Sequence, residues 1–246
     1  MTQGREVFAP GACDAGAALT YDARTMPKMK SCPVQRLIKH AYHHGDLRNA
    51  LVDEGLKLLE TGNADFTLRD LASRVGVSAA APYSHFEDKN ALLAAIATAG
   101  FNKLSQFLEA SIKEDKDPTE QYVHMGEAYV RFGILNPALY KLMFASEELP
   151  AQRDKFPELQ EAGAAAFRAL TSMLARMQES GFLRPGNLDG FGLAVWAHVH
   201  GLASLIITGR VDCAGECADG GITSTEEATR MSLLGMLNGL KNPATA

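Results

Sequence analysis

Apolar residues recur at helical spacing along most of the chain after about residue 46. The clearest case is the segment 67–75, where Leu68, Leu71, Ala72 and Val75 stand at i, i+3, i+4 and i+7 and share one face of a helix. No convincing two-residue alternation, the mark of a half-buried strand, appears. The pattern therefore predicts an all-α fold.

We expect about nine helices, with ends marked by capping residues, glycine or proline. Their expected ranges are 46–60, 67–75, 78–85, 90–114, 118–132, 136–144, 157–180, 187–209 and 224–240. The expected N-terminal caps include Asp88, Asp117, Asn136, Asn187 and Ser224. Residues 1–40 lack sustained periodicity and are interrupted by prolines and glycines, so we expect a disordered arm there.

Two short helices joined by a tight turn are predicted within residues 66–89. Thr67 is a good N-cap, and Asp70 can complete a capping box with it. Gly76 can end the first helix because glycine tolerates the left-handed conformation there. Ser78 is the expected cap of the second helix. This arrangement matches a helix-turn-helix, whose second helix enters the major groove of DNA.

The second of these helices has small side chains where it would meet the groove. Residues 79–81 are all alanine, which permits close approach to the base edges. Tyr83 and His85 follow with donors suited to phosphate oxygens. Lys89 stands at the start of the next helix, where a phosphate would offset its unfavourable interaction with the helix dipole. A solvated lysine on a surface turn explains Lys89 equally well.

Four sequence segments resemble a known family. TLRDLASRVGVS, PYSHF and DKNALL, within residues 67–93, resemble the DNA-binding domain of the TetR family of bacterial regulators, and YHHGDLRNAL at 42–51 resembles the first helix of one of its subgroups. NPALYKLMF at 136–144 and VWAHVHGLASL at 195–205 resemble a regulatory domain called WHG, after its Trp-His-Gly signature. The resemblance extends from about residue 42 to the end of the last helix.

The resemblance implies a disordered arm (1–40), a helix-turn-helix DNA-binding domain (41–90) and a ligand-binding and dimerisation domain (91–246). It implies a cytoplasmic, homodimeric transcriptional repressor that leaves a near-palindromic DNA operator when a small apolar or aromatic effector binds. Arg69 and residues 79–81 fall where the family reads bases. The full expected DNA-contacting set is Thr67, Arg69, Ser78, Ala79, Ala80, Ala81, Tyr83, His85 and Lys89.

Aromatic and methionine residues between positions 125 and 196 are expected to form mainly core. Some of them can line an effector pocket, because pockets between bundle helices are common and methionine adapts to varied apolar ligands. The expected pocket residues are His124, Tyr129, Tyr140, Phe144, Phe167, Trp196 and His200. By resemblance, the last two helices form an intersubunit bundle through Leu193, Trp196, Leu205, Ile206, Met231, Leu234 and Leu237.

Composition agrees with a folded protein and leaves DNA binding undecided. The 246 residues are 46% hydrophobic and carry a net charge of −5, which argues against a generic polyanion binder. A specific DNA binder needs only local basic positions, so this charge does not exclude one. We also expect no signal peptide and no apolar run long enough to cross a bilayer.

Two other classes of function stay open. One is a metal or thiol protein that uses His198, His200, Cys213 and Cys217. Residues two apart on a helix point about 200° apart, so no metal site and no cofactor are expected from this set. No nucleophile elbow, Walker loop, dinucleotide fingerprint or HExxH motif is present, so we expect no enzyme. The other class is a helical protein–protein adaptor without DNA binding.

Overall fold

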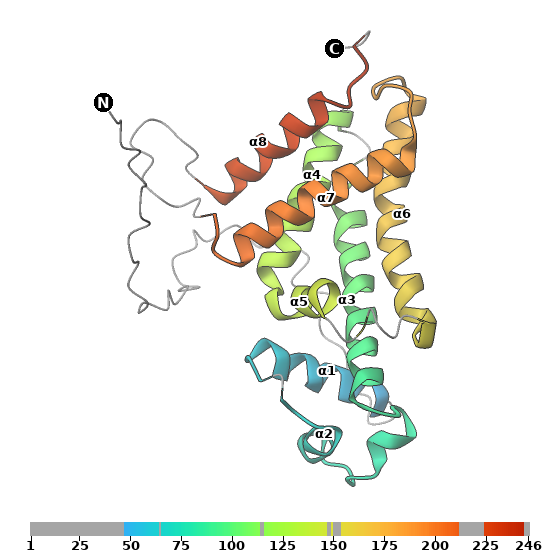
Figure 1. Ribbon diagram of the computed structural model, residues 1–246, viewed down its shortest axis with the longest axis vertical. Coiled ribbons are helices and arrows are strands. Elements are labelled where there is room, and N and C mark those ends of the chain that lie inside the picture. The colour runs from blue at the N-terminus through green and yellow to red at the C-terminus, as the bar shows by residue number, and fades with distance from the viewer. Residues whose placement is uncertain are drawn as a thin grey trace, which may run out of the picture. The chain divides into compact units, whose positions relative to one another are not determined.

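The computed structural model describes residues 47–63, 65–113, 116–146, 149, 154–211 and 224–243. The helices of this part of the chain belong to one compact unit, and no strand is present among them (Figure 1). The all-α prediction is confirmed. In chain order the elements are α1 (Leu47–Glu60), α2 (Leu68–Val75), the 3₁₀ helix η2 (Ala81–Ser84), α3 (Lys89–Ser111), α4 (Pro118–Leu135), α5 (Pro137–Ala145), α6 (Pro157–Glu179), α7 (Leu188–Ile207) and α8 (Thr225–Asn238).

Besides α2, which is described below, four helices begin with a side-chain cap at the predicted residue. Asp88 accepts a hydrogen bond from the Ala91 amide, and Asp117 accepts from the amides of the first turn of α4. Asn187 and Ser224 cap α7 and α8 in the same way. Each cap satisfies an amide that has no partner within the helix, so these boundaries are local properties of the sequence.

Asn136, which we expected to cap α5, has a different role. Its side chain is buried and makes no capping bond; its Nδ2 donates to the Phe132 carbonyl at 2.8 Å. Its Oδ1 accepts from Lys103 Nζ at 2.7 Å. Asn136 therefore ties the junction of α4 and α5 to the middle of α3.

The long helix α3 connects the α1–α2 end of the unit to the helices that follow (Figure 1). It packs against α1, α4, α5 and α6. Glycine permits two of these contacts to be close: a Cβ at Gly55 of α1 would lie 2.8 Å from Ile96, and one at Gly100 would lie 2.6 Å from Met143 of α5. Because α5 also packs against α1, it contacts both α1 and α3.

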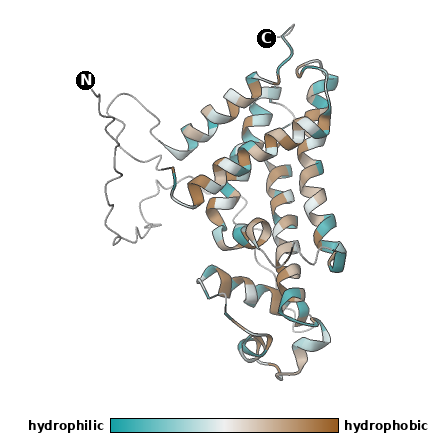
Figure 2. Ribbon diagram, viewed as in Figure 1, coloured by the Kyte–Doolittle hydropathy of each residue, from teal (hydrophilic) through white to brown (hydrophobic). Residues whose placement is uncertain are grey.

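Helix α7 contradicts the expectation that no apolar segment is long enough to cross a bilayer. It is the one helix among the described residues that is long and apolar enough to cross a membrane by length and composition, with a mean hydropathy of 1.5 (Figure 2). Only 22% of this apolar stretch of α7 is buried.

Three side chains on the last two helices form an exposed apolar surface, called here the α7–α8 face. They are Leu193 (57% exposed) and Leu205 on α7 and Met231 (57%) on α8. Leu237, predicted to belong to it, is fully buried instead.

Candidate functional site

The predicted capping box fixes the start of α2. The Thr67 amide donates to Asp70 Oδ2 at 2.8 Å, and Thr67 Oγ1 accepts from the Asp70 amide at 3.2 Å. The hydrogen bonds from Thr67 lower the pKa of the Asp70 carboxyl. Gly76 ends the helix in the left-handed conformation, with φ of 81°. The first half of the expected helix-turn-helix is therefore confirmed as a local structure.

The second half is shorter than expected. Residues 78–85 do not form an α-helix; a turn at residues 79–80 leads into the 3₁₀ helix η2. Because Pro82 has no N–H, it cannot bond to the Ser78 carbonyl, which accepts from the Ala81 amide at 3.0 Å instead. Ser78 makes no side-chain cap to η2, so that prediction is wrong.

Most of the expected DNA-contacting side chains are accessible. Ala81 and Lys89 are partly buried, and the exposed members are Thr67, Arg69, Ser78, Ala79, Ala80, Tyr83 and His85. Lys89 Nζ lies 4.9 Å from the centre of the buried Phe66 ring, within cation–π range. This contact holds the lysine beside the start of α2.

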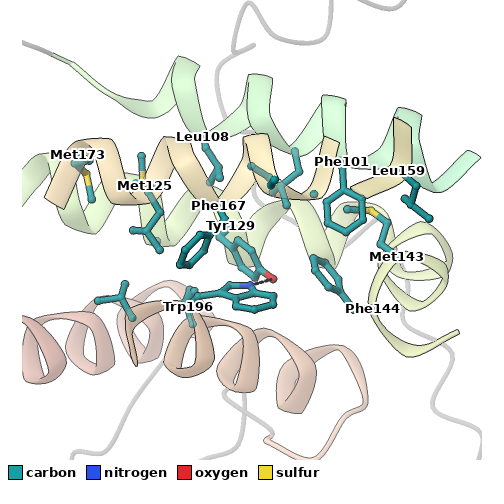
Figure 3. A pocket seen from close by; sticks show the side chains of 18 of the residues that line it. Phe101, Leu108, Met125, Tyr129, Met143, Phe144, Leu159, Phe167, Met173 and Trp196 are labelled. Carbon is teal, nitrogen blue, oxygen red and sulfur yellow. Dashed lines mark hydrogen bonds between the residues drawn. The ribbon is translucent and has the colours of Figure 1, made fainter. Parts of the chain in front are cut away.

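A cavity of about 440 Å³ lies within the bundle and is lined from α3, α4, α5, α6, α7 and α8 (Figure 3). Four of the seven expected pocket residues line it, namely Tyr129, Phe144, Phe167 and Trp196. Their rings meet edge-on or tilted; Phe167 and Trp196 have centroids 6.1 Å apart. Such contacts leave ring faces available to an apolar molecule.

Tyr140 and His200 are absent from the lining and form a hydrogen-bonded group next to it. Both the Tyr129 and Tyr140 hydroxyls approach His200 Nδ1, at 2.9 and 2.7 Å, and Trp196 Nε1 donates to the Tyr129 hydroxyl at 3.3 Å. Burial lowers the pKa of His200, which favours a neutral ring with Nδ1 as acceptor. The group joins α4, α5 and α7.

Acidification should weaken this group. Since the folded-state pKa of His200 lies below its ordinary value of 6.5, the unfolded chain binds a proton first as the pH falls, and the free energy of unfolding decreases below about pH 6.5. His200→Gln keeps a hydrogen-bonding side chain and removes this titration. Urea unfolding at pH 7.5 and 5.5 should show a larger loss of stability in the parent than in His200→Gln; equal losses would contradict the assignment.

The other two candidate histidines, His124 and His198, do not line the cavity. His124 Nε2 is 3.6 Å from Glu120, which also pairs with Arg230 of α8. His198 Nε2 is 2.9 Å from Ser232 Oγ of α8. No cluster of metal-ligating side chains exists among the described residues. The candidates Cys213 and Cys217 lie outside the described residues, as does the expected arm.

The lining includes residues that were not expected from the sequence, and Tyr122 is one of them. Tyr122 lines the cavity, and its hydroxyl is buried without a hydrogen-bond partner among the described residues. The signal was its spacing, because Tyr122, Gly126 and Tyr129 stand at i, i+4 and i+7 and all line the cavity.

Comparison with known proteins gives this architecture a family. Residues 51–96 match the model described as bacterial regulatory proteins of the tetR family, and residues 122–223 match the tetracyclin repressor-like C-terminal domain. The chain belongs to the TetR family. It is therefore a DNA-binding transcriptional regulator and not an enzyme. The C-terminal match of this TetR family member includes Trp196, His200 and Gly201 of the signature noted above.

Solved structures share the fold. A protein of unknown function from Rhodococcus sp. RHA1 is 30% identical over 82% of this chain and 99% of its own, with a TM-score of 0.68. A tetR family regulatory protein from Rhodococcus RHA1 is 15% identical over 78% and 96%, with a TM-score of 0.57. The TetR family regulator PfmR from Thermus thermophilus is 24% identical over 76% and 97%, with a TM-score of 0.53. A search of curated proteins found no match.

Proposed function

We propose that this regulator is a homodimeric repressor that binds a near-palindromic operator and is released by a small, mainly apolar effector in the bundle cavity. The observation that carries the proposal is the placement of α3 and α5. Both helices line the cavity, and both pack against α1 beside the helix-turn-helix. An occupant of the cavity therefore touches two helices that pack against α1, and α1 in turn packs against α2. The proposed role places the protein in the cytoplasm.

The proposed DNA contacts divide into base reading and backbone binding. Arg69 projects from α2 into solvent and is the candidate for guanine. Ala79 and Ala80 allow the turn to approach the base edges closely. Tyr83, 50% exposed, and His85 supply donors for phosphate oxygens. Residues 41–90 would form the DNA-binding domain and residues 91–246 the effector and dimerisation domain.

Footprinting on the intergenic DNA that flanks the gene should first define an operator. Arg69→Ala is then expected to weaken operator binding by about 1–3 kcal/mol and to relax one base position. Lys89→Ala should weaken binding evenly across sequences and lower the salt slope by about one unit, as expected for a lost phosphate contact. Fluorescence anisotropy at several salt concentrations measures both effects.

Arg176→Ala is the matched control, because it removes an equal charge from the exposed side of α6. It should bind like the parent. If Arg69→Ala and Lys89→Ala also bind like the parent, the proposed docking is wrong. If footprinting finds no protected site, the adaptor alternative is favoured.

The α7–α8 face supports the homodimer. Its leucine side chains lie exposed on α7, of which little is buried, and its methionine lies exposed on α8. Gly201 and Gly235 lie on the same two helices, and a Cβ at either would meet no atom within 4 Å. A second copy of the chain can therefore approach both helices closely. Twofold symmetry would present two helix-turn-helix units to half-sites about 34–36 Å or somewhat more apart.

An effector can control DNA binding only if its affinity differs between the DNA-competent and the DNA-incompetent state of the protein. An effector that fits the cavity only when α3 is tilted would bind the DNA-incompetent state more tightly, with a coupling typically of about 1–3 kcal/mol. Operator DNA must then weaken effector binding by the same factor. Thermal-shift screening followed by operator binding with each hit tests this. A true inducer that still acts fully on folded Phe144→Ala and Trp196→Ala proteins would place the effector site elsewhere.

A further inference from the structure

The polar atoms around the cavity identify the chemical class of its occupant. Building on the proposed effector control, we infer that the cavity takes an electrically neutral, mostly apolar molecule whose one oxygen acceptor pairs with the hydroxyl of Tyr122. Three features carry this inference: the absence of charge in the described lining, the prior engagement of the other polar groups, and the unsatisfied hydroxyl of Tyr122.

The described lining contains no charged side chain and no histidine. It consists of apolar and aromatic residues with only Tyr122, Tyr129, Ser146 and Gln160 as polar members. A carboxylate or ammonium group that entered this cavity would lose its hydration without gaining a counter-charge from those residues, which is strongly unfavourable. The described part of the lining therefore selects against charged ligands.

The other polar groups of the lining already have partners or reach solvent. The Tyr129 hydroxyl accepts from Trp196 and is hydrogen-bonded to His200 Nδ1. Ser146 Oγ accepts from the Leu149 amide at 3.4 Å. Gln160 is exposed, so water can solvate its amide. None of these groups requires a ligand.

Tyr122 differs from all of them. Its side chain is 2% exposed, and its hydroxyl has no hydrogen-bond partner among the described residues. Burial raises the pKa of Tyr122, so the hydroxyl stays protonated and remains a donor. A buried donor without an acceptor is unfavourable, and nearly all such groups in folded proteins are paired. A carbonyl, ether or hydroxyl oxygen on the ligand would satisfy it once a small shift of the ring turns the hydroxyl, which is closed off from solvent, toward the ligand.

The size of the cavity agrees with a molecule of small organic dimensions. Its volume of about 440 Å³ falls in the range of about 300–1,000 Å³ usual for ligand sites. Rings of Phe101, Phe144, Phe167 and Trp196 surround it, as Figure 3 shows. These rings provide apolar contact for an alkyl chain or a ring system, while Tyr122 fixes the position of its oxygen.

Trp196 is the only tryptophan of the chain and lines the cavity, so its fluorescence reports occupancy directly. The full-length protein is titrated with four probes: 2-decanone, n-butylbenzene, decanoate and decylamine. All have ten carbons, but only 2-decanone is neutral with an oxygen acceptor. We expect 2-decanone to change the Trp196 emission saturably and the two ions to bind at least about 10-fold more weakly.

Tyr122→Phe removes the hydroxyl and keeps the ring. It should weaken 2-decanone binding by about 3- to 10-fold and leave n-butylbenzene binding unchanged or tighter. Without ligand, the variant should melt at a temperature equal to or above that of the parent, because an unpaired buried hydroxyl is gone. Ser105→Ala removes another buried hydroxyl without a partner among the described residues, one outside the cavity lining, so it is the matched control and should alter neither affinity.

The inference would be overturned if Tyr122→Phe lost the same factor in binding affinity for 2-decanone and for n-butylbenzene. It would also be overturned if decanoate or decylamine bound as tightly as 2-decanone, or if no probe changed the Trp196 emission; these two results need only the parent protein. Operator binding is measured separately. Tight 2-decanone binding without operator release would contradict effector control and leave the assigned ligand class standing.

Discussion

Leu193→Glu should make the protein monomeric at micromolar concentration and weaken operator binding at least about 100-fold. Leu193 is 57% exposed on α7, so the substitution leaves the core of the chain intact. In a dimer, it would place an unpaired carboxylate in the buried centre of the interface, once from each copy. The two DNA-binding units would then bind independently and lose an avidity of about 10²–10⁴.

Leu135→Glu provides the matched control for this experiment. Leu135 has nearly the same exposure, 55%, but ends α4 and lies outside the α7–α8 face. Light scattering and operator anisotropy should find that Leu135→Glu resembles the parent, whereas Leu193→Glu is monomeric. A parent that is already monomeric at micromolar concentration would rule out the dimer model.

Ala80→Glu should weaken operator binding by about 2–3 kcal/mol or more, roughly 30- to 150-fold, because like-charge contacts at an interface typically cost several kcal/mol. Ala80 is exposed in the turn before η2, so the substitution disturbs no core packing. In the proposed complex this turn approaches the DNA closely. The added carboxylate would meet phosphates and would also obstruct the approach.

Ala110→Glu carries the same change in charge at an exposed position near the end of α3. Anisotropy with the footprinted operator should give this variant nearly the affinity of the parent, since charges beyond a Debye length of about 10 Å are largely screened. Similar losses in both variants would indicate a general electrostatic effect and would remove the evidence that residue 80 faces DNA.

Local interactions explain what the sequence predicted well. The capping box of Thr67 and Asp70 joins residues three apart, and the caps at Asp88 and Ser224 act over the same short distance. Such bonds form wherever the helix begins, so composition and spacing suffice to predict them. The failure at residues 78–85 was also local, because the missing N–H of Pro82 favours the tighter helix.

Only the tertiary structure shows which apolar residues of the last two helices are buried. Leu193 and Leu237 are both apolar residues on predicted helical faces, yet one is 57% exposed and the other is fully buried. Periodicity identifies an apolar face but does not say which partner covers it. The packing of α8 against α4 and α7 determines that Leu237 faces the core, while Leu193 faces solvent in the single chain.

The cavity chemistry depends on contacts between residues far apart in the chain. The sequence by itself determined the eight α-helices of the described residues, the caps of five of them, the family resemblance and four of the aromatic residues that line the cavity. It did not determine that Tyr129 and His200, 71 residues apart, would form a hydrogen bond with each other. Nor did it determine that the Tyr122 hydroxyl would have no hydrogen-bond partner among the described residues. Hydrogen bonding of a buried group depends on which atoms of other helices reach it, and only the packed bundle decides that.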